Sequence, residues 1–127
     1  MAVSASQSAT FPAAPTSARA ARDFLRTVLP DLAADVIDVV LLLVTELVTN
    51  AVVHAQTSVR VCVEISGSRV RIDVQDEATI MPERRPVSVE SLGGRGLLLV
   101  EGLADRWGYE PHPWGKTVWF EINGAPG

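Results

Sequence analysis

The sequence predicts an α+β fold, a two-layer α/β sandwich in which three helices cover a mainly antiparallel sheet of about four strands. Three observations carry this prediction. Residues 36–53 are the most apolar window and contain no Gly or Pro, which favours a helix. Residues 59–74 alternate around a Ser-Gly-Ser turn, which indicates a hairpin. The elements follow in the order helix, helix, strand, strand, helix, strand, strand. The 127 residues make up one ordinary domain.

Residues 1–16 are expected to form a disordered tail, because fourteen of the first eighteen residues are Ala, Ser, Thr or Pro. A single domain then spans residues 17–127. Ser17 can cap a first helix, whose apolar residues recur at helical spacing up to a stop at Pro30. The first residues lack the basic start and the apolar stretch of a signal peptide, so we expect a cytoplasmic protein.

A second, longer helix is predicted to begin near Asp31 or Asp35 and to continue to about Ala55. Its many β-branched residues would also allow strands, but its length favours a helix. Acidic residues such as Asp38 and Glu46 interrupt the apolar run, which indicates a buried helix and not a membrane span.

The later elements follow the hairpin. Residues 77–92 contain two prolines and mixed charge, which predicts a long irregular loop. Residues 97–104 predict a short helix, and residues 107–110 and 116–122 predict two more strands.

Charge and cysteine usage narrow the function classes. Eleven Lys and Arg against fifteen Asp and Glu give a net charge of −4, so no overall positive field favours nucleic acid. The single cysteine, Cys62, cannot form an internal disulfide and is expected to be a small strand residue.

Glu46, Asn50 and His54 are spaced four apart on the long helix and form one polar stripe. An asparagine oxygen can coordinate Mg²⁺, and a carboxylate one turn away can orient or deprotonate a nucleophile. The alternative is that the stripe is simply the solvent face of the helix. For His54, a polar residue that complements the helix dipole is an equally ordinary explanation.

Asp76 continues the alternation of Val70, Ile72 and Val74, which would place it on the covered face of the sheet. A carboxylate there requires a partner, such as a backbone group, a threonine or the amino group of adenine. If the strand ends at Gln75, Asp76 is only a turn residue, and the sequence leaves both possibilities open.

The glycines of residues 93–96 precede a helix, so their backbone could approach a phosphate. They do not form a dinucleotide-binding fingerprint, because Leu99 stands where a glycine is required. Gly115-Lys116-Thr117 is not the end of a P-loop, because Glu110 stands at the first glycine position. No zinc-type spacing of Cys and His and no nucleophile elbow is present.

Taken in order, these motifs resemble the GHKL (histidine kinase-like) ATP-binding domain, most closely its stand-alone anti-sigma-factor serine/threonine kinase branch. Residues 46–51 with His54 resemble the N box, and Asp76 stands at the position of the adenine-reading aspartate. Residues 94–97 resemble the second glycine box, and residues 115–118 resemble the closing strand. The resemblance implies a Bergerat-type ATP-binding fold over nearly the whole chain after Ser17.

The resemblance also implies roles for individual residues. Glu46 would be the catalytic base and Asn50 the ligand of Mg²⁺, while Asp76 would accept a hydrogen bond from adenine and Thr117 would support that end of the pocket. The glycine box would hold the phosphates of ATP under a lid formed by residues 77–95, through Gly94, Arg95, Gly96 and Leu97. His54 would also approach the nucleotide. One departure is that Glu77-Ala78-Thr79 follows Asp76, where the family commonly has glycine.

The resemblance predicts an ATP-dependent serine/threonine protein kinase that regulates transcription by partner switching. Its partners would be a small antagonist protein, which it phosphorylates, and a sigma factor, and it would form a homodimer. No partnership with nucleic acid or membrane is expected. The alternative is a nucleotide-responsive regulator that binds its partner without phosphorylating it, which the departure at residues 77–79 keeps open. A histidine-kinase fragment or an ATPase is a weaker third hypothesis, because 127 residues leave no room for a dimerisation helix pair or a transducer domain.

Overall fold

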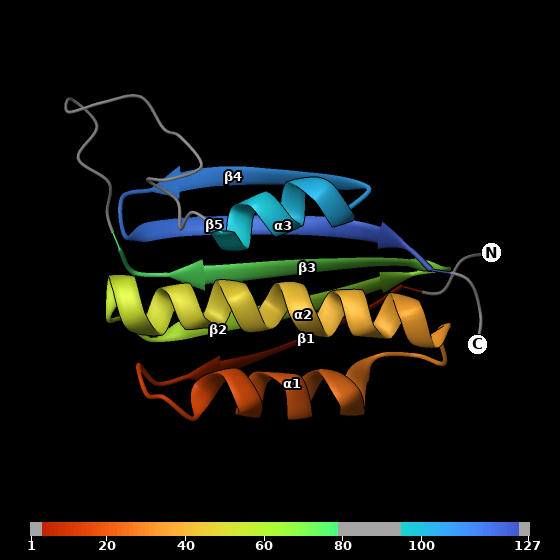
Figure 1. Cartoon of the computed structure of the whole chain (residues 1–127), viewed down its shortest axis with the longest axis horizontal. Coiled ribbons are helices and arrows are strands. Elements are labelled where there is room, and N and C mark those ends of the chain that lie inside the picture. The colour runs from red at the N-terminus through yellow and green to blue at the C-terminus, as the bar shows by residue number, and fades with distance from the viewer. Residues whose placement is uncertain (1–3, 79–94, 125–127) are drawn as a thin grey trace.

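The computed structural model describes residues 4–78 and 95–124, which form a sheet with its helices on one face (Figure 1). The elements in chain order are β1 (Ser4–Phe11), α1 (Ser17–Val28), α2 (Ala34–Asn50), the π-helical turn η1 (Ala51–Ala55), β2 (Val59–Ser66), β3 (Arg69–Asp76), α3 (Arg95–Leu103), β4 (Arg106–His112) and β5 (Gly115–Asn123). Each strand pairs antiparallel with its neighbours in the order β1-β2-β3-β5-β4. The predicted two-layer α+β sandwich is confirmed, and the described part of the sheet has five strands where about four were expected.

The additional strand, β1, lies in the segment for which composition indicated a disordered tail. It pairs with β2 along its whole length, from Ser4 opposite Ser66 to Phe11 opposite Val59. The Phe11 ring also packs edge-on against Phe24 of α1, with 6.2 Å between ring centroids. Composition missed this strand because ladder hydrogen bonds use backbone groups, which Ala, Ser and Thr supply as well as any other residue.

Helix α1 begins at Ser17 and ends two residues before Pro30, close to the predicted span. Ser17 does not cap it, however. Thr16 occupies the cap position without a side-chain cap bond, and the Ser17 hydroxyl donates a hydrogen bond to the Pro12 carbonyl oxygen at 2.6 Å. This hydrogen bond therefore links the start of α1 to the residue that follows β1.

Helix α2 and the π-helical turn η1 together span the predicted long helix. The stretch Ala34–Ala55 is long and apolar enough to cross a membrane by length and composition alone, a test that core helices also pass. Here α2 lies across the sheet between α1 and α3 (Figure 1). Its residues Val40, Leu43, Val44 and Val48 are completely buried, so it is the central helix of the core.

The strands sort their side chains between two faces. On β3, Val70, Ile72 and Val74 are buried beneath the helices, and we call this side the helix face. The alternate residues, among them Arg71 and Asp73, lie on the opposite side, which we call the open face. The residues of β5 opposite these in the ladder share their faces. This division decides which side chains can share a site.

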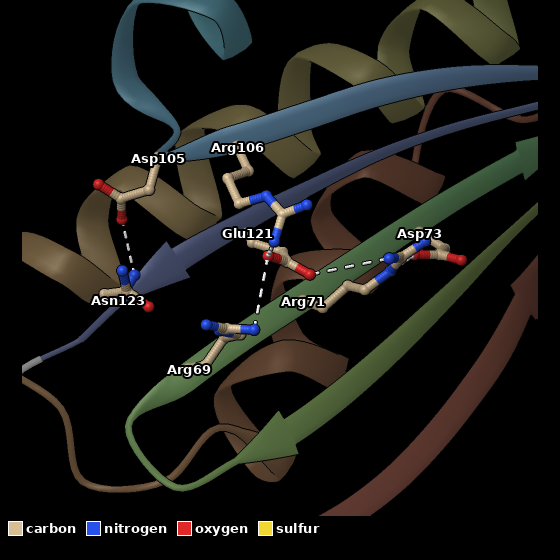
Figure 2. A network of polar contacts seen from close by, with 7 residues as sticks. All are labelled: Arg69, Arg71, Asp73, Asp105, Arg106, Glu121 and Asn123. Atoms are coloured by element: carbon tan, nitrogen blue, oxygen red, sulfur yellow. Dashed lines mark hydrogen bonds and ion pairs between the residues drawn. The ribbon is translucent and has the colours of Figure 1, made fainter.

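The open face carries a charged network centred on Glu121 of β5 (Figure 2). Three arginine side chains lie within ion-pair distance of its carboxylate: Arg71 at 3.7 Å, Arg106 at 3.7 Å and Arg69 at 4.0 Å. Arg71 also bonds Asp73 at 2.9 Å and lies 4.2 Å from the centre of the Trp119 ring. These contacts join β3, β4 and β5 on the side of the sheet away from the helices.

The remaining predictions agree in type with the structure, with shifted boundaries. The hairpin is formed by β2 and β3, the short helix is α3, and the last two strands are β4 and β5. Both of these strands are longer than predicted. Most of the predicted loop and lid, residues 79–94, lies outside the described residues.

Candidate functional site

Asp76 is the last residue of β3 and its carboxylate is buried on the helix face. It pairs opposite Val59 in the β2 ladder, so the strand does not end at Gln75, and the turn-residue alternative is wrong. Only 6% of the residue is exposed. One carboxylate oxygen, Oδ1, accepts a hydrogen bond from the Ala78 backbone N–H at 2.9 Å. The other oxygen has a side-chain partner on β5.

That partner is Lys116, which stands directly opposite Asp76 in the ladder between β3 and β5. Its Nζ atom donates to Asp76 Oδ2 at 2.6 Å, and the two side chains are 13% and 8% exposed. Burying two charges is costly unless they pair with good geometry. The short contact between Asp76 and Lys116 therefore offsets the cost of burying both charges. Neighbouring Gly115 permits the approach, because a Cβ there would lie 2.0 Å from the Asp76 carbonyl oxygen.

A pocket opens between α2 and the strands β3 and β5. Its lining residues are Leu47 and Asn50 from α2, Val74 and Asp76 from β3, and Lys116 and Val118 from β5. The space between these residues, counted together with the part that is open to solvent, is about 240 Å³, so the pocket is a shallow opening and not an enclosed cavity. Apolar walls with a few converging polar groups are typical of small-molecule sites. The walls suit a flat apolar ring, and the polar groups can recognise its edge.

Glu46 and Asn50 lie one turn apart on α2, and both are half-buried. Gly96, near the start of α3, packs directly against them. A Cβ at Gly96 would lie 2.7 Å from Asn50 Nδ2 and 3.4 Å from Glu46 Cβ. The structure therefore brings the two sequence motifs into contact, and this part of the polar stripe is not simply a solvent face.

Tyr109 of β4 contributes a buried hydroxyl near Asp76. It stands opposite Val118 and packs against the core, so it shares the helix face. Burial raises the pKa of the Tyr109 hydroxyl, and the charge of Asp76 raises it further. Among the residues that the structure describes, this hydroxyl has no hydrogen-bond partner. A buried hydroxyl without a partner is often satisfied by a bound water or ligand.

Thr117 does not reach the pocket, contrary to the role that the resemblance implied. It stands opposite Gln75 in the ladder and therefore lies on the open face. Its Oγ1 atom is 2.9 Å from His112 Nε2, in a hydrogen bond within the hairpin of β4 and β5. Side chains alternate along a strand, so a shift of one residue moves a side chain to the other face. Lys116, and not Thr117, faces Asp76.

The other predicted residues are Leu97, His54, Gly94 and Arg95. Leu97 is completely buried in the core, so only its backbone could meet a ligand. His54 is exposed in η1 and does not line the pocket. The wider winding of a π-helical turn rotates it away from the direction that an α-helix would give it. Gly94 and the Arg95 side chain lie outside the described residues.

Sequence reasoning missed two residues of this site, Lys116 and Tyr109. A signal for Lys116 was present, because counting alternate residues back from the buried Phe120 and Val118 leads to it. No comparable signal pointed to Tyr109, because its nearness to Asp76 depends on β5 lying between β3 and β4.

Comparisons with known proteins agree with the two-layer α+β fold. No curated protein sequence matches the chain. One similar solved structure is described as the crystal structure of the RsbU and RsbW domains of Rv1364c from Mycobacterium tuberculosis, with a TM-score of 0.72 and 22% identity. The match covers 94% of this chain but only 32% of that one, so this chain spans about a third of its length. The family model for the histidine kinase-like ATPase domain matches residues 11–122. With its fold and nearly its whole length accounted for by that model, the chain belongs to the histidine kinase-like ATPase domain family.

Proposed function

We propose that this protein binds ATP with Mg²⁺ and acts as an anti-sigma-factor-type serine/threonine protein kinase. The observation that carries the proposal is the buried carboxylate of Asp76 at an apolar-walled pocket that Asn50 also lines. Nucleotide binding is what membership of an ATPase domain family implies. The kinase would work in the cytoplasm as a homodimer and control transcription by exchanging partners.

The described residues support one orientation of bound ATP. Asp76 would accept a hydrogen bond from the adenine amino group, with Leu47 and Val118 packing on the ring. The side-chain oxygen of Asn50 would help to hold Mg²⁺, which neutralises charge on the phosphates. The backbone at the start of α3 is available to the phosphates, since Gly96 lies against Asn50.

Glu46 is the proposed catalytic base, one turn before Asn50 on α2. It would take the proton of a serine or threonine hydroxyl as that oxygen forms its bond to the γ-phosphorus. The bond from the γ-phosphorus to the bridging oxygen breaks, and ADP leaves. Phosphoryl transfer needs mainly positioning and charge stabilisation, which the Glu46 carboxylate and the neighbouring Asn50 amide would supply.

The proposed partners are a small antagonist protein, as the phosphorylated substrate, and a sigma factor. The resemblance of the motifs to the anti-sigma branch supports this, and so does the fold shared with a chain that contains an RsbW domain. The net charge of −4 gives no reason to expect nucleic acid as a direct partner.

Calorimetric titration with ATP and Mg²⁺ tests the nucleotide site. Asp76→Asn should lose at least about tenfold in affinity, because it removes a charged acceptor. Asp73→Asn is the matched control, since Asp73 lies on the same strand but on the open face, bonded to Arg71. Native protein that folds but does not bind ATP would refute the nucleotide site.

A phosphoryl-transfer assay tests the kinase step separately. Glu46→Ala should keep ATP affinity close to native and lose transfer to the antagonist protein, because Glu46 would act on the substrate hydroxyl and not on the adenine ring. Asn50→Ala should weaken ATP binding in the presence of Mg²⁺ more than in its absence. Equal native affinity with and without Mg²⁺ would contradict the role of Asn50.

A second candidate is a nucleotide-responsive regulator that does not transfer phosphate. The observation that favours it is the anchoring of Glu77, where the family commonly has a glycine-containing stretch. The Glu77 carboxylate accepts a hydrogen bond from Ser58 Oγ at 2.9 Å, and its N–H donates to Thr57 Oγ1 at 3.2 Å. ATP binding by native protein without transfer to any copurifying antagonist would favour this candidate.

A further inference from the structure

Lys116 is the only lysine among the 127 residues, which otherwise use arginine for every basic side chain. It lies on the helix face at the pocket, with its ammonium 2.6 Å from Asp76 Oδ2. An ammonium is a compact charge with three donors, whereas a guanidinium is a broad planar fork. The compact ammonium is the group that pairs with Asp76 here.

The ion pair places a donor and an acceptor side by side at the pocket. One N–H of Lys116 is directed to Asp76, which leaves two donors on the same nitrogen. Among the described residues Asp76 accepts hydrogen bonds from Ala78 and Lys116, and a carboxylate has about four acceptor positions. Both groups can therefore bind a further partner without giving up the pair.

The edge of adenine carries the complementary pattern. Its N6 amino group is a donor, and the adjacent ring atom N1 is an acceptor. Guanine has the reverse pattern, with an acceptor at O6 and a donor at N1. We propose that Lys116 is a specificity-determining residue, whose ammonium donates to N1 of adenine while Asp76 accepts from N6. This inference rests on the proposed nucleotide site.

The surrounding backbone fixes the positions of Lys116 and Asp76 relative to each other. Gly115 brings the start of β5 against the Asp76 carbonyl, where any Cβ would collide, and the ladder fixes Lys116 opposite Asp76. Groups held in this way lose little freedom when a ligand binds, which improves both affinity and selectivity.

Calorimetry with ATP and with 1-deaza-ATP, in which carbon replaces N1, tests the inference on native protein. ATP should bind at least about tenfold more tightly, because a hydrogen bond from a charged donor is lost with the analogue. Purine riboside triphosphate, which keeps N1 but lacks the amino group, separately reports on Asp76. Equal affinity for ATP and 1-deaza-ATP would overturn the role of Lys116.

Two variants then assign the discrimination to a residue. Lys116→Met should reduce the preference for ATP over 1-deaza-ATP to within about twofold. Lys116→Gln, which keeps an N–H donor, should retain part of it, and circular dichroism checks that both variants fold. Arg69→Met is the matched control, because it removes a positive charge from the open face of β3 and should keep the native preference.

The possible results separate this inference from the proposed function. Tighter ATP binding by Lys116→Met than by native protein would show that the lysine only fills the pocket, which refutes the inference and leaves the nucleotide site intact. Absence of binding of any of the three nucleotides to native protein would refute both. Loss of the preference in Lys116→Met, with Arg69→Met unchanged, would establish the inference.

Discussion

Gly96 is the residue at which the two sequence motifs on α2 and α3 touch. Gly96→Ala would place a Cβ 2.7 Å from Asn50 Nδ2, at the far end of that side chain. Stability should therefore change by less than about 1 kcal/mol, because the contact is with the end of a side chain and not with backbone, and because alanine favours a helix. ATP affinity in the presence of Mg²⁺ should fall, because the displaced amide is the proposed ligand.

Gly102 on the same helix supplies the control for this prediction. A Cβ there meets nothing within 4 Å, so Gly102→Ala should gain up to about 1 kcal/mol of stability from helix propensity. Its ATP affinity should equal that of native protein. Urea unfolding and calorimetry measure the two quantities, and full ATP affinity in Gly96→Ala would count against the position assigned to Asn50.

Glu121 makes a residue-level prediction on the open face. Its side chain is 11% exposed, and one carboxylate oxygen has no hydrogen-bond partner within the described part of the chain, only arginines at ion-pair distance. Glu121→Gln should lower the free energy of unfolding by about 1–2 kcal/mol, because the arginines lose their common counter-charge. Arg106→Gln should change it by less than about 1 kcal/mol, since that side chain is 66% exposed. A larger loss in the arginine variant would contradict this description of the network.

Among the elements, β1 is the strand that the amino-acid composition did not predict, and its contribution to stability can be tested. Deleting residues 1–11 removes a strand that pairs along all of β2, together with the Phe11 contact to α1. The truncated protein should fold, because the buried core residues run from Ala21 to Ile122. It should lose about 1–3 kcal/mol of stability in urea unfolding, with added self-association through the uncovered edge of β2.

The Phe11→Ala variant of the full chain divides this effect into two parts. It removes the ring contact with Phe24 and leaves the backbone pairing of β1 intact. Its loss of stability should be smaller than that of the truncation. A truncated protein as stable as the full chain would show that residues 1–11 behave as part of the tail that composition indicated.

At the scale of the whole molecule, stability should decline at alkaline pH. Tyr109, the only tyrosine, has a pKa raised above its ordinary value of about 10 by burial and by Asp76. Folding therefore favours the protonated hydroxyl. This contribution is complete below the unfolded-state pKa of about 10 and is lost as pH rises through the higher folded-state pKa.

Two measurements check this dependence. Phenolate absorbance during an alkaline titration reports on Tyr109 alone, and its midpoint in folded protein should lie above that in urea. Tyr109→Phe should show a shallower loss of unfolding free energy above about pH 10 than native protein does. Identical titration midpoints in the folded and unfolded protein would contradict a buried hydroxyl beside Asp76.

Local sequence patterns were enough to predict most of the fold and several residues of the candidate site. Periodicity separated helices from strands, because side chains recur every 3.6 residues in one and every two in the other. It placed Asp76 in line with Val70, Ile72 and Val74, and it identified Glu46 and Asn50 as one stripe. These inferences are local, so neighbouring residues contain the information that they need.

How distant segments of the chain meet could not be predicted from local patterns. The pairing of β1 with β2 depends on backbone groups that composition does not report. The register between β3 and β5 put Lys116 opposite Asp76 and sent Thr117 to the open face. Because a strand has a period of two, one residue of register changes the face, and that register is set by contacts between residues about forty positions apart.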